Sequence, residues 1–230
     1  MKKLLLILAF LPSIVFANEM EIGVTAPIDP SDQASLQRGA RTFINNCLNC
    51  HSANYMRYNR LLDIGLTEKQ IKDNLLFAGE KVGDTMKVAI NKGDAKKWFG
   101  VAPPDLSVEV RARGADWVYA YMRGFYRDET TPSGWNNVVF DKVAMPHVLY
   151  ELQGEQVLNH ETHMLELVRP GKLSPSEYNA FVADLTNYMA FMAEPAKQQR
   201  KRTGIWVLLF LGLLLVLAIK LKKAYWKDIK

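Results

Sequence analysis

The residues with the clearest chemical potential are Cys47, Cys50 and His51, which form a Cys-x-x-Cys-His run. This run is the attachment signature of c-type haem. Two thiols three positions apart can each add to one vinyl group of a haem, and the adjacent imidazole can bind the iron. The chain has no other cysteine, so no thiol remains for a disulfide, an iron–sulfur cluster or a four-cysteine zinc site. The sequence therefore predicts one covalently attached haem c, with His51 as an axial ligand.

Two other chemistries use the same residue types. Paired cysteines can form a thioredoxin-like redox centre, or they can supply half of a zinc site that His160 and His163 complete. A redox pair does not need the adjacent His51, and an export signal at the N-terminus fits haem attachment outside the cytoplasm. We therefore favour haem over both alternatives.

The ligand on the opposite side of the iron is not defined by spacing. The candidates are nine methionines and three histidines, namely His147, His160 and His163. Methionine ligation raises the reduction potential, histidine ligation lowers it, and an open position suits gas or peroxide chemistry. The residue pattern alone leaves these arrangements open.

A helix must bring the chain into the cysteine motif. Asp32 is a candidate N-cap for this helix. Apolar residues then recur at helical spacing, which predicts one apolar face against the haem and the core: Leu36, Ala40, Phe43, Ile44 and Cys47.

Two capping boxes predict further helices. One begins at Thr67 and opens a short helix that we expect to run through Phe77. The other begins at Ser174, with Pro175 at the first helical position, and predicts a helix to about Ala193.

The run Ala102–Ser107 contains two consecutive prolines, Pro103 and Pro104. Proline fixes an extended backbone and removes the N–H donor, which suits a chain that passes an apolar haem face. Such a run is also typical of a lead into a helix, which we expect to start near Asp105. Further along, residues 138–140 are a candidate short strand.

Residues 1–17 are typical of a secretory signal peptide, with Lys2 and Lys3 before an apolar centre and small residues up to Ala17. An uncleaved anchor is the alternative, but the apolar centre is too short to span a bilayer comfortably. A mitochondrial transit peptide would be amphipathic and rich in Arg and Ser. We therefore expect a bacterial protein whose haem domain, residues 18–196, lies in the periplasm.

The C-terminal part predicts a single membrane anchor. We expect a basic linker at residues 197–203, a transmembrane helix at 204–221 in the inner membrane, and a cytoplasmic tail at 222–230. Lys and Arg are similarly frequent on the two sides of the helix, so the positive-inside rule does not orient it. Export of the domain sets the orientation instead.

The charge is divided unevenly along the chain. Residues 18–196 contain 18 Lys and Arg against 23 Asp and Glu, a formal charge of −5, whereas residues 197–230 are strongly basic. The basic residues therefore lie beside an apolar run rather than on a folded face. This distribution argues against nucleic-acid binding and favours contact with a lipid bilayer.

The order of the motifs resembles the cytochrome c1 family, the haem subunits of quinol:cytochrome c oxidoreductase (bc1) complexes. A Pro-containing lead and the Cys-x-x-Cys-His run precede Ala102–Ser107, followed by Val110–Gly114, Ala144–His147 and one apolar C-terminal helix. The likeness covers nearly the whole mature chain. It implies a mainly α fold, in which a c-type cytochrome haem domain with long loops is attached to a single C-terminal transmembrane helix.

The resemblance also implies roles for individual residues. Met145 is expected to be the sixth ligand of the iron, with His147 as the alternative. Arg113 is expected to pair with a haem propionate, since a buried carboxylate needs a cation. Pro103 and Pro104 are expected to line the haem cleft.

The function implied by the resemblance is electron transfer in a respiratory chain. The chain would take single electrons from the Rieske iron–sulfur protein, beside a cytochrome b subunit, and pass them to a cytochrome c. It would be no enzyme by itself. The alternatives are an anchored electron carrier or oxidase subunit outside a bc1 complex, and a haem enzyme with an open iron site.

Overall fold

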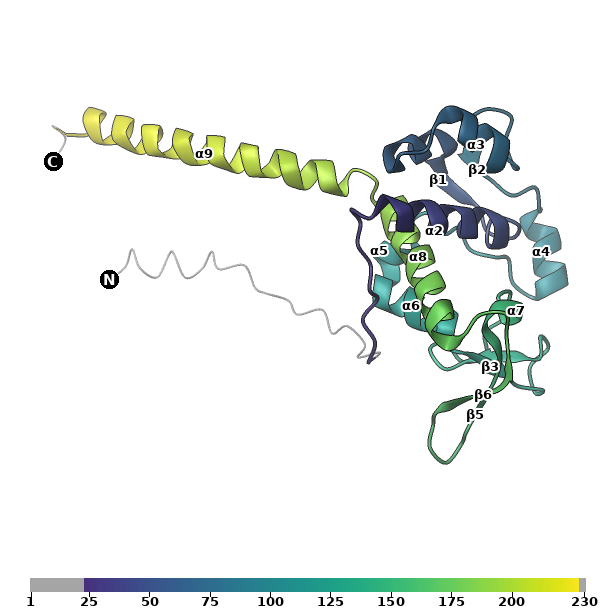
Figure 1. Cartoon of the computed structure of the whole chain (residues 1–230). Coiled ribbons are helices and arrows are strands. Elements are labelled where there is room, and N and C mark those ends of the chain that lie inside the picture. Colours follow the sequence, from purple (N-terminus) through teal and green to yellow (C-terminus); the bar gives the residue numbers. More distant parts are fainter. Residues whose placement is uncertain (1–22, 228–230) are drawn as a thin grey trace.

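The computed structural model describes residues 23–227, so the predicted signal peptide at residues 1–17 lies outside the described part. Helices dominate, and the expected mainly α class is confirmed (Figure 1). The strands of the described residues pair as antiparallel two-stranded sheets. In chain order the elements are α2 (Gln33–Asn46), β1 (Ala53–Arg57), the 3-10 helix η1 (Tyr58–Ile64), α3 (Glu68–Asn74), β2 (Thr85–Met86), α4 (Lys92–Phe99), α5 (Glu109–Arg113), α6 (Ala115–Arg123), β3 (Phe125–Arg127), β4 (Trp135–Asn137), α7 (Tyr150–Gln153), β5 (Gly154–Leu158), β6 (Leu165–Pro170), α8 (Pro175–Ala193) and α9 (Lys197–Tyr225).

The domain is organised around α2 and α8, which cross in close contact (Figure 1). Gly39 of α2 faces α8, where an added Cβ would overlap the carbonyl oxygen of Asp184 and lie 2.7 Å from the Cβ of Tyr188. The missing side chain of Gly39 therefore permits this approach. Arg38 adds two hydrogen bonds to the Asp184 carboxylate, at 2.6 and 2.9 Å. Together these contacts hold α2 firmly just before the cysteine motif.

Three helix starts predicted from capping residues are confirmed. The Asp32 carboxylate accepts a hydrogen bond from the Ser35 amide at 3.0 Å and begins α2. Capping boxes at Thr67 and Ser174 begin α3 and α8, and α8 ends at Ala193 as expected. These starts depend on groups three residues apart, so the local sequence contains all the information they need.

Two helix boundaries were predicted wrongly. α3 ends at Asn74 rather than near Phe77, because two successive amides after it bind the same carbonyl oxygen, that of Ile71. The helix expected near Asp105 begins only at Glu109. The side chain of Asp105 binds amides of a distant segment instead of capping a helix.

The strand expected at residues 138–140 is also wrong. The strand in this region is β4, at Trp135–Asn137, which pairs with β3. Its two asparagines are poor strand formers, whereas residues 138–140 are two β-branched valines and a phenylalanine, which favour strands. Pairing with β3, rather than local preference, therefore decides which residues form the strand.

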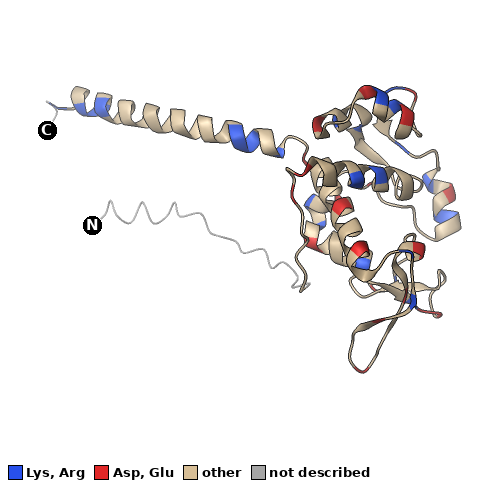
Figure 2. Cartoon of the chain, in the orientation of Figure 1, with Lys and Arg blue, Asp and Glu red and all other residues tan. Residues whose placement is uncertain are grey.

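The C-terminal helix α9 is exposed along its whole length and is the one helix within residues 23–227 that is long and apolar enough to cross a membrane. Its 29 residues span about 43 Å. Figure 2 shows Lys and Arg at both ends of α9 and none in its middle. Residues 197–203, expected as a basic linker, are helical and continuous with the apolar stretch.

Candidate haem site

The cysteine motif lies at the C-terminal end of α2. Cys47 is the C-cap of this helix, and the amides of Cys50 and His51 both bind its carbonyl oxygen, at 3.1 and 2.9 Å. Both cysteines are free thiols of intermediate exposure. The turn therefore keeps two thiols and one imidazole within a single short stretch of backbone.

The ring of His51 is oriented by a carbonyl group far along the chain. Its Nδ1 lies 2.8 Å from the carbonyl oxygen of Pro104, 53 residues away. A carbonyl oxygen only accepts hydrogen bonds, so Nδ1 carries the proton and Nε2 keeps its lone pair. An imidazole in this tautomer can bind a metal through Nε2, and the hydrogen bond fixes the direction of the ring.

The segment that supplies this carbonyl is fixed to the residues that follow the cysteine motif. Pro104 itself is exposed and Pro103 is half-buried. Asp105 accepts a hydrogen bond from the amide of Ser107 at 2.9 Å, which fixes the local turn. The cross-links between the two segments join the Leu106 amide to Ser52 O at 2.9 Å, Asp105 Oδ2 to Asn54 N and Nδ2 at 2.8 and 2.7 Å, and Ser107 Oγ to Tyr55 N at 3.1 Å.

Burial determines the protonation states at the motif. It raises the pKa of the Cys47 thiol to about 12, and it lowers the pKa of His51 despite the opposing effect of the hydrogen bond to Pro104. At neutral pH the motif therefore presents a neutral thiol and a neutral imidazole. A thioredoxin-like centre needs an attacking thiolate with a lowered pKa, and Cys47, whose thiol pKa is raised, does not supply one.

The zinc alternative also lacks structural support. His160 and His163 are exposed and lie in the turn between β5 and β6. No group of three or more His, Cys, Asp or Glu side chains suited to a metal ion occurs within residues 23–227. Within the described residues, the cysteines therefore form no metal-binding group with His160 and His163.

Met145 lies in the loop between β4 and α7 and packs against both apolar clusters of the domain. Its Sδ accepts a hydrogen bond from the hydroxyl of Tyr121 at 3.5 Å. The Tyr121 ring belongs to α6 and stacks on Trp117, with 4.9 Å between ring centres. Burial raises the pKa of Tyr121, so its hydroxyl keeps the proton. The thioether thus has a defined neighbour on one side.

His147, two residues beyond Met145, faces a different environment. Its ring is buried, stacks on Phe125 at 4.7 Å and meets the edge of Trp135 at 5.0 Å. Neither ring nitrogen has a hydrogen-bond partner within the described residues. Burial lowers the pKa of His147 to about 4. This imidazole is therefore enclosed by aromatic rings, whereas Met145 is only half-buried.

Arg113 ends α5, and its side chain is 44% exposed. Its Nε donates to the Glu109 carboxylate at 2.6 Å, and its guanidinium lies 4.4 Å from the ring centre of Trp117. Only one of its N–H groups is used by Glu109, so others remain able to bind a second carboxylate. A ring stack thus connects Arg113 through Trp117 to Tyr121, the neighbour of Met145.

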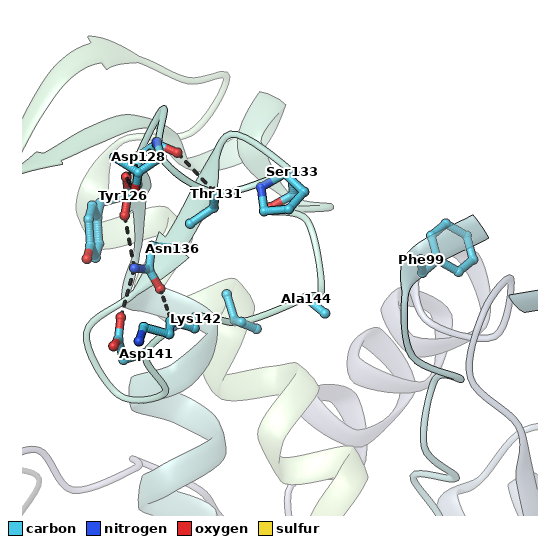
Figure 3. Close-up of a pocket in the computed structure, with 12 residues that line it drawn as sticks. Phe99, Tyr126, Asp128, Thr131, Ser133, Asn136, Asp141, Lys142 and Ala144 are labelled. Carbon is cyan, nitrogen blue, oxygen red and sulfur yellow. Dashed lines mark hydrogen bonds between the residues drawn. The ribbon is translucent and has the colours of Figure 1, made fainter. Parts of the chain in front are cut away.

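A cavity of about 590 Å³ lies beside the loop that carries Met145 (Figure 3). Phe99, four residues before Pro103, lines one side of it. Ala144, next to Met145, lies across from Phe99. His51 does not line this cavity, but the chain segments that lead to Pro103 and to Met145 both border it.

The loop that carries Met145 is held in place by the buried side chain of Asn136. The amide nitrogen of Asn136 donates to Asp128 at 3.0 Å and to Asp141 at 2.9 Å, and its oxygen accepts from the Lys142 amide at 2.8 Å (Figure 3). Both polar atoms of the Asn136 side chain therefore bind the loop. The contacts are with Asp141 and with Lys142, which lies three residues before Met145.

The predicted residues fall into two groups. The cysteine motif and Pro104 form one group, and Arg113 and Met145, joined through Trp117 and Tyr121, form the other. Sequence analysis missed the contact of Tyr121 with Met145. Its only signal was the recurrence of aromatic residues along α6, which is more commonly a feature of a core.

The donor set fits a haem. Two free thiols suit the two vinyl groups, an imidazole with an available Nε2 suits the iron, and a thioether is a second possible axial ligand. With one apolar helix that is exposed throughout, the mainly helical domain has the layout of an anchored c-type cytochrome.

Comparisons with known proteins agree with this class. The Cytochrome C1 family matches residues 24–84 and 78–229. The chain is 50% identical to cytochrome c1 of Allochromatium vinosum over 216 residues, which cover 89% of this chain and 88% of that protein. It is 52% identical over 229 residues to a Nitrosomonas europaea protein named ammonia monooxygenase gamma subunit, covering 99% and 98% of the two chains. The chain belongs to the cytochrome c1 family, whose members are haem proteins of electron transport.

One solved structure is described as a hyperthermophilic respiratory Complex III. A chain of that structure aligns with 91% of this chain and 82% of its own length, at 16% sequence identity and a TM-score of 0.43.

Proposed function

We propose that this chain is the cytochrome c1 subunit of a quinol:cytochrome c oxidoreductase (bc1) complex in a respiratory chain. It carries single electrons from the Rieske iron–sulfur protein to a cytochrome c, and it is an electron-transfer subunit rather than an enzyme by itself. Family membership and the exposed apolar helix α9, which would lie in the bilayer beside cytochrome b, support this proposal.

The proposed cofactor is one haem c, which Cys47 and Cys50 would hold through thioether bonds and whose iron His51 Nε2 and Met145 Sδ would bind. Bound haem supplies the one-electron ferric/ferrous couple. The observation that carries the proposal is the hydrogen bond from His51 Nδ1 to the Pro104 carbonyl oxygen, because it orients the ring and leaves Nε2 available.

Met145 is preferred to His147 as the second ligand because of their surroundings. Met145 is half-buried and follows Ala144, which lines the cavity, whereas the His147 ring is packed between Phe125 and Trp135. To reach a metal, His147 would have to leave this aromatic packing, which is worth about 0.5–1.5 kcal/mol for each aromatic pair.

The remaining residues of the site have supporting roles in this proposal. Arg113 pairs with a haem propionate, since its guanidinium is already held by Glu109 and Trp117 and keeps unused N–H groups. Pro103 and Pro104 line the cleft, where their lack of N–H groups leaves no unsatisfied donor beside an apolar ring.

The location follows from the export signal and the anchor. We propose that residues 1–17 are removed, that 18–196 lie in the periplasm, and that α9 crosses the bacterial inner membrane once. The Lys-rich tail, residues 222–230, then lies in the cytoplasm.

A second candidate partner comes from the name of the Nitrosomonas relative, which associates that protein with an ammonia monooxygenase. This name favours an anchored electron carrier that serves a membrane-bound monooxygenase outside a bc1 complex. The haem site would be the same in both cases, so the partner must be identified directly.

Purification from the native membrane distinguishes the two candidates. The chain, tagged at its C-terminus and solubilised in mild detergent, should co-purify with a b-type cytochrome and an iron–sulfur protein, and the preparation should reduce cytochrome c when quinol is added. A matched preparation of the Cys47→Ala variant should lose this reduction. Recovery with a monooxygenase, and without b-type haem, would overturn the bc1 assignment.

A further inference from the structure

We infer that Tyr121 is a positioning residue for Met145, and that its hydroxyl raises the reduction potential of the haem iron. The inference deepens the proposed function and rests on ligation of the iron by Met145. Its starting point is the distance of 3.5 Å from the Tyr121 hydroxyl to Met145 Sδ. The hydroxyl donates and the thioether sulfur accepts, because a thioether has no proton to give.

The hydroxyl is directed by an aromatic packing that leaves the ring little freedom. Trp117 lies four residues before Tyr121 on the same side of α6, and Phe125, four residues after Tyr121, is the first residue of β3. Tyr121 stacks on Trp117 at an interplanar angle of 11° and meets Phe125 edge to face at 71°, with 5.1 Å between ring centres. The Tyr121 carbonyl oxygen also accepts a hydrogen bond from Asn137 at 2.8 Å. The Tyr121 ring is therefore held by two aromatic neighbours, and its backbone is held by Asn137.

Met145 Sδ is the one hydrogen-bond partner of this hydroxyl within residues 23–227. A Tyr hydroxyl in a half-buried position normally has a partner, since an unsatisfied one costs about 1–3 kcal/mol. Met145 is flexible and has three rotatable side-chain bonds. The hydrogen bond from Tyr121 therefore favours one of the rotamers of the Met145 side chain and so sets the position of its sulfur.

The electronic consequence follows from the two lone pairs of a thioether sulfur. One lone pair binds the iron, and the other accepts the hydrogen bond. A donor at the sulfur withdraws electron density from it, which weakens donation to the iron and favours the ferrous state. Hydrogen bonding to axial ligands is one of the means by which a protein sets a haem potential. Loss of the Tyr121 hydroxyl should therefore lower the potential.

The test is Tyr121→Phe in the full-length, detergent-solubilised protein, because Phe keeps the ring stack and removes only the hydroxyl. At a fixed ambient potential, the ferrous-to-ferric ratio should fall at least threefold, which is a downward shift of about 28 mV at 59 mV per tenfold change for one electron. The far-red absorption band of methionine-ligated ferric haem should persist. Only protein with bound haem is titrated, so partial loss of haem does not hide the effect.

The matched control is Tyr119→Phe, which removes a hydroxyl from the same helix. Tyr119 is buried beneath the Arg123 guanidinium, and within residues 23–227 its side chain forms no hydrogen bond with Met145. The reduction potential of the Tyr119→Phe variant should equal that of the wild type. An unchanged potential in Tyr121→Phe, with the far-red band retained, would overturn the inference and leave the proposed function intact. A wild-type protein that lacks the band would overturn both this inference and ligation by Met145.

Discussion

Hydrogen bonds join residues 104–107 to the segment 51–55, which begins at the end of the cysteine motif. Asp105→Asn tests how much these bonds contribute to stability. The carboxylate of Asp105 accepts two hydrogen bonds from Asn54 on one oxygen and one from the Ser107 amide on the other. Asparagine offers only one oxygen, so an NH2 group must face an N–H donor on one side. A hydrogen bond to a charged group contributes about 1.5–3 kcal/mol. We therefore expect Asp105→Asn to lower the free energy of unfolding by about this amount.

Thermal unfolding of the haem-loaded, detergent-solubilised protein measures the effect. A domain of this size loses roughly 2–4 °C of Tm per kcal/mol, so Tm should fall by about 3–12 °C. Asp73→Asn is the control, because Asp73 is 52% exposed and pairs only with Lys69 on the surface of α3. Removal of such a pair changes stability by at most about 0.5 kcal/mol. The Tm of Asp105→Asn should therefore fall clearly below that of Asp73→Asn.

The difference should depend on pH in one direction. Burial opposes the charge on Asp105, but hydrogen bonds from Ser107 and Asn54 outweigh it and lower the pKa below the ordinary 3.8. A lowered pKa contributes stability that is present above the ordinary value and is lost as pH falls through the folded-state value. Wild type and Asp105→Asn should thus differ at neutral pH and converge in acid. Equal Tm values at pH 7, or a gap that persists in strong acid, would refute this reasoning.

Three further changes test other parts of the molecule. Met145→Leu should abolish the far-red band and let carbon monoxide bind the ferrous haem, whereas His147→Ala should do neither; the reverse pattern would reassign the ligand. Gly39→Ala should destabilise the protein by about 1–2 kcal/mol net in denaturant titrations, because overpacking against the α8 backbone costs up to about 3 kcal/mol and the helical gain offsets only about 0.5–1 kcal/mol. Gly83→Ala, in open space, is its control and should change little. A chain that ends at Ala196 should be exported as a soluble, red protein that ascorbate reduces; aggregation without haem would show that α9 belongs to the core.

Local chemistry explains which parts of the fold could be predicted from the sequence. The starts of α2, α3 and α8 were predicted correctly because Asp32, Thr67 and Ser174 each bind an amide three residues later. The strand near residues 138–140 was misplaced because β4 depends on pairing with β3, and its own asparagines disfavour a strand. A boundary that depends on a distant partner cannot be found by reading neighbouring residues.

The same distinction applies to the candidate site. The cysteine motif can be recognised from five adjacent residues, so the sequence alone predicts the His51 side of the haem site. The carbonyl group that orients His51 comes from Pro104, and no local pattern connects these two residues. The roles of Arg113 and Met145 are predicted only by resemblance to a family, since a single arginine or methionine has no distinctive spacing of its own.

The two sides of the proposed haem site are consequently built in different ways. On the His51 side, a covalent motif on a turn fixes the ligand, and one carbonyl group sets its direction. On the Met145 side, the ligand lies in a loop, so its position depends on the Asn136 side chain and on the Tyr121 hydroxyl. On this proposal, a change in the loop would alter the reduction potential while the haem would stay attached through its thioether bonds. If Met145 ligates the iron as proposed, the Met145 side is therefore where substitutions would adjust the electron affinity of the site without loss of the cofactor.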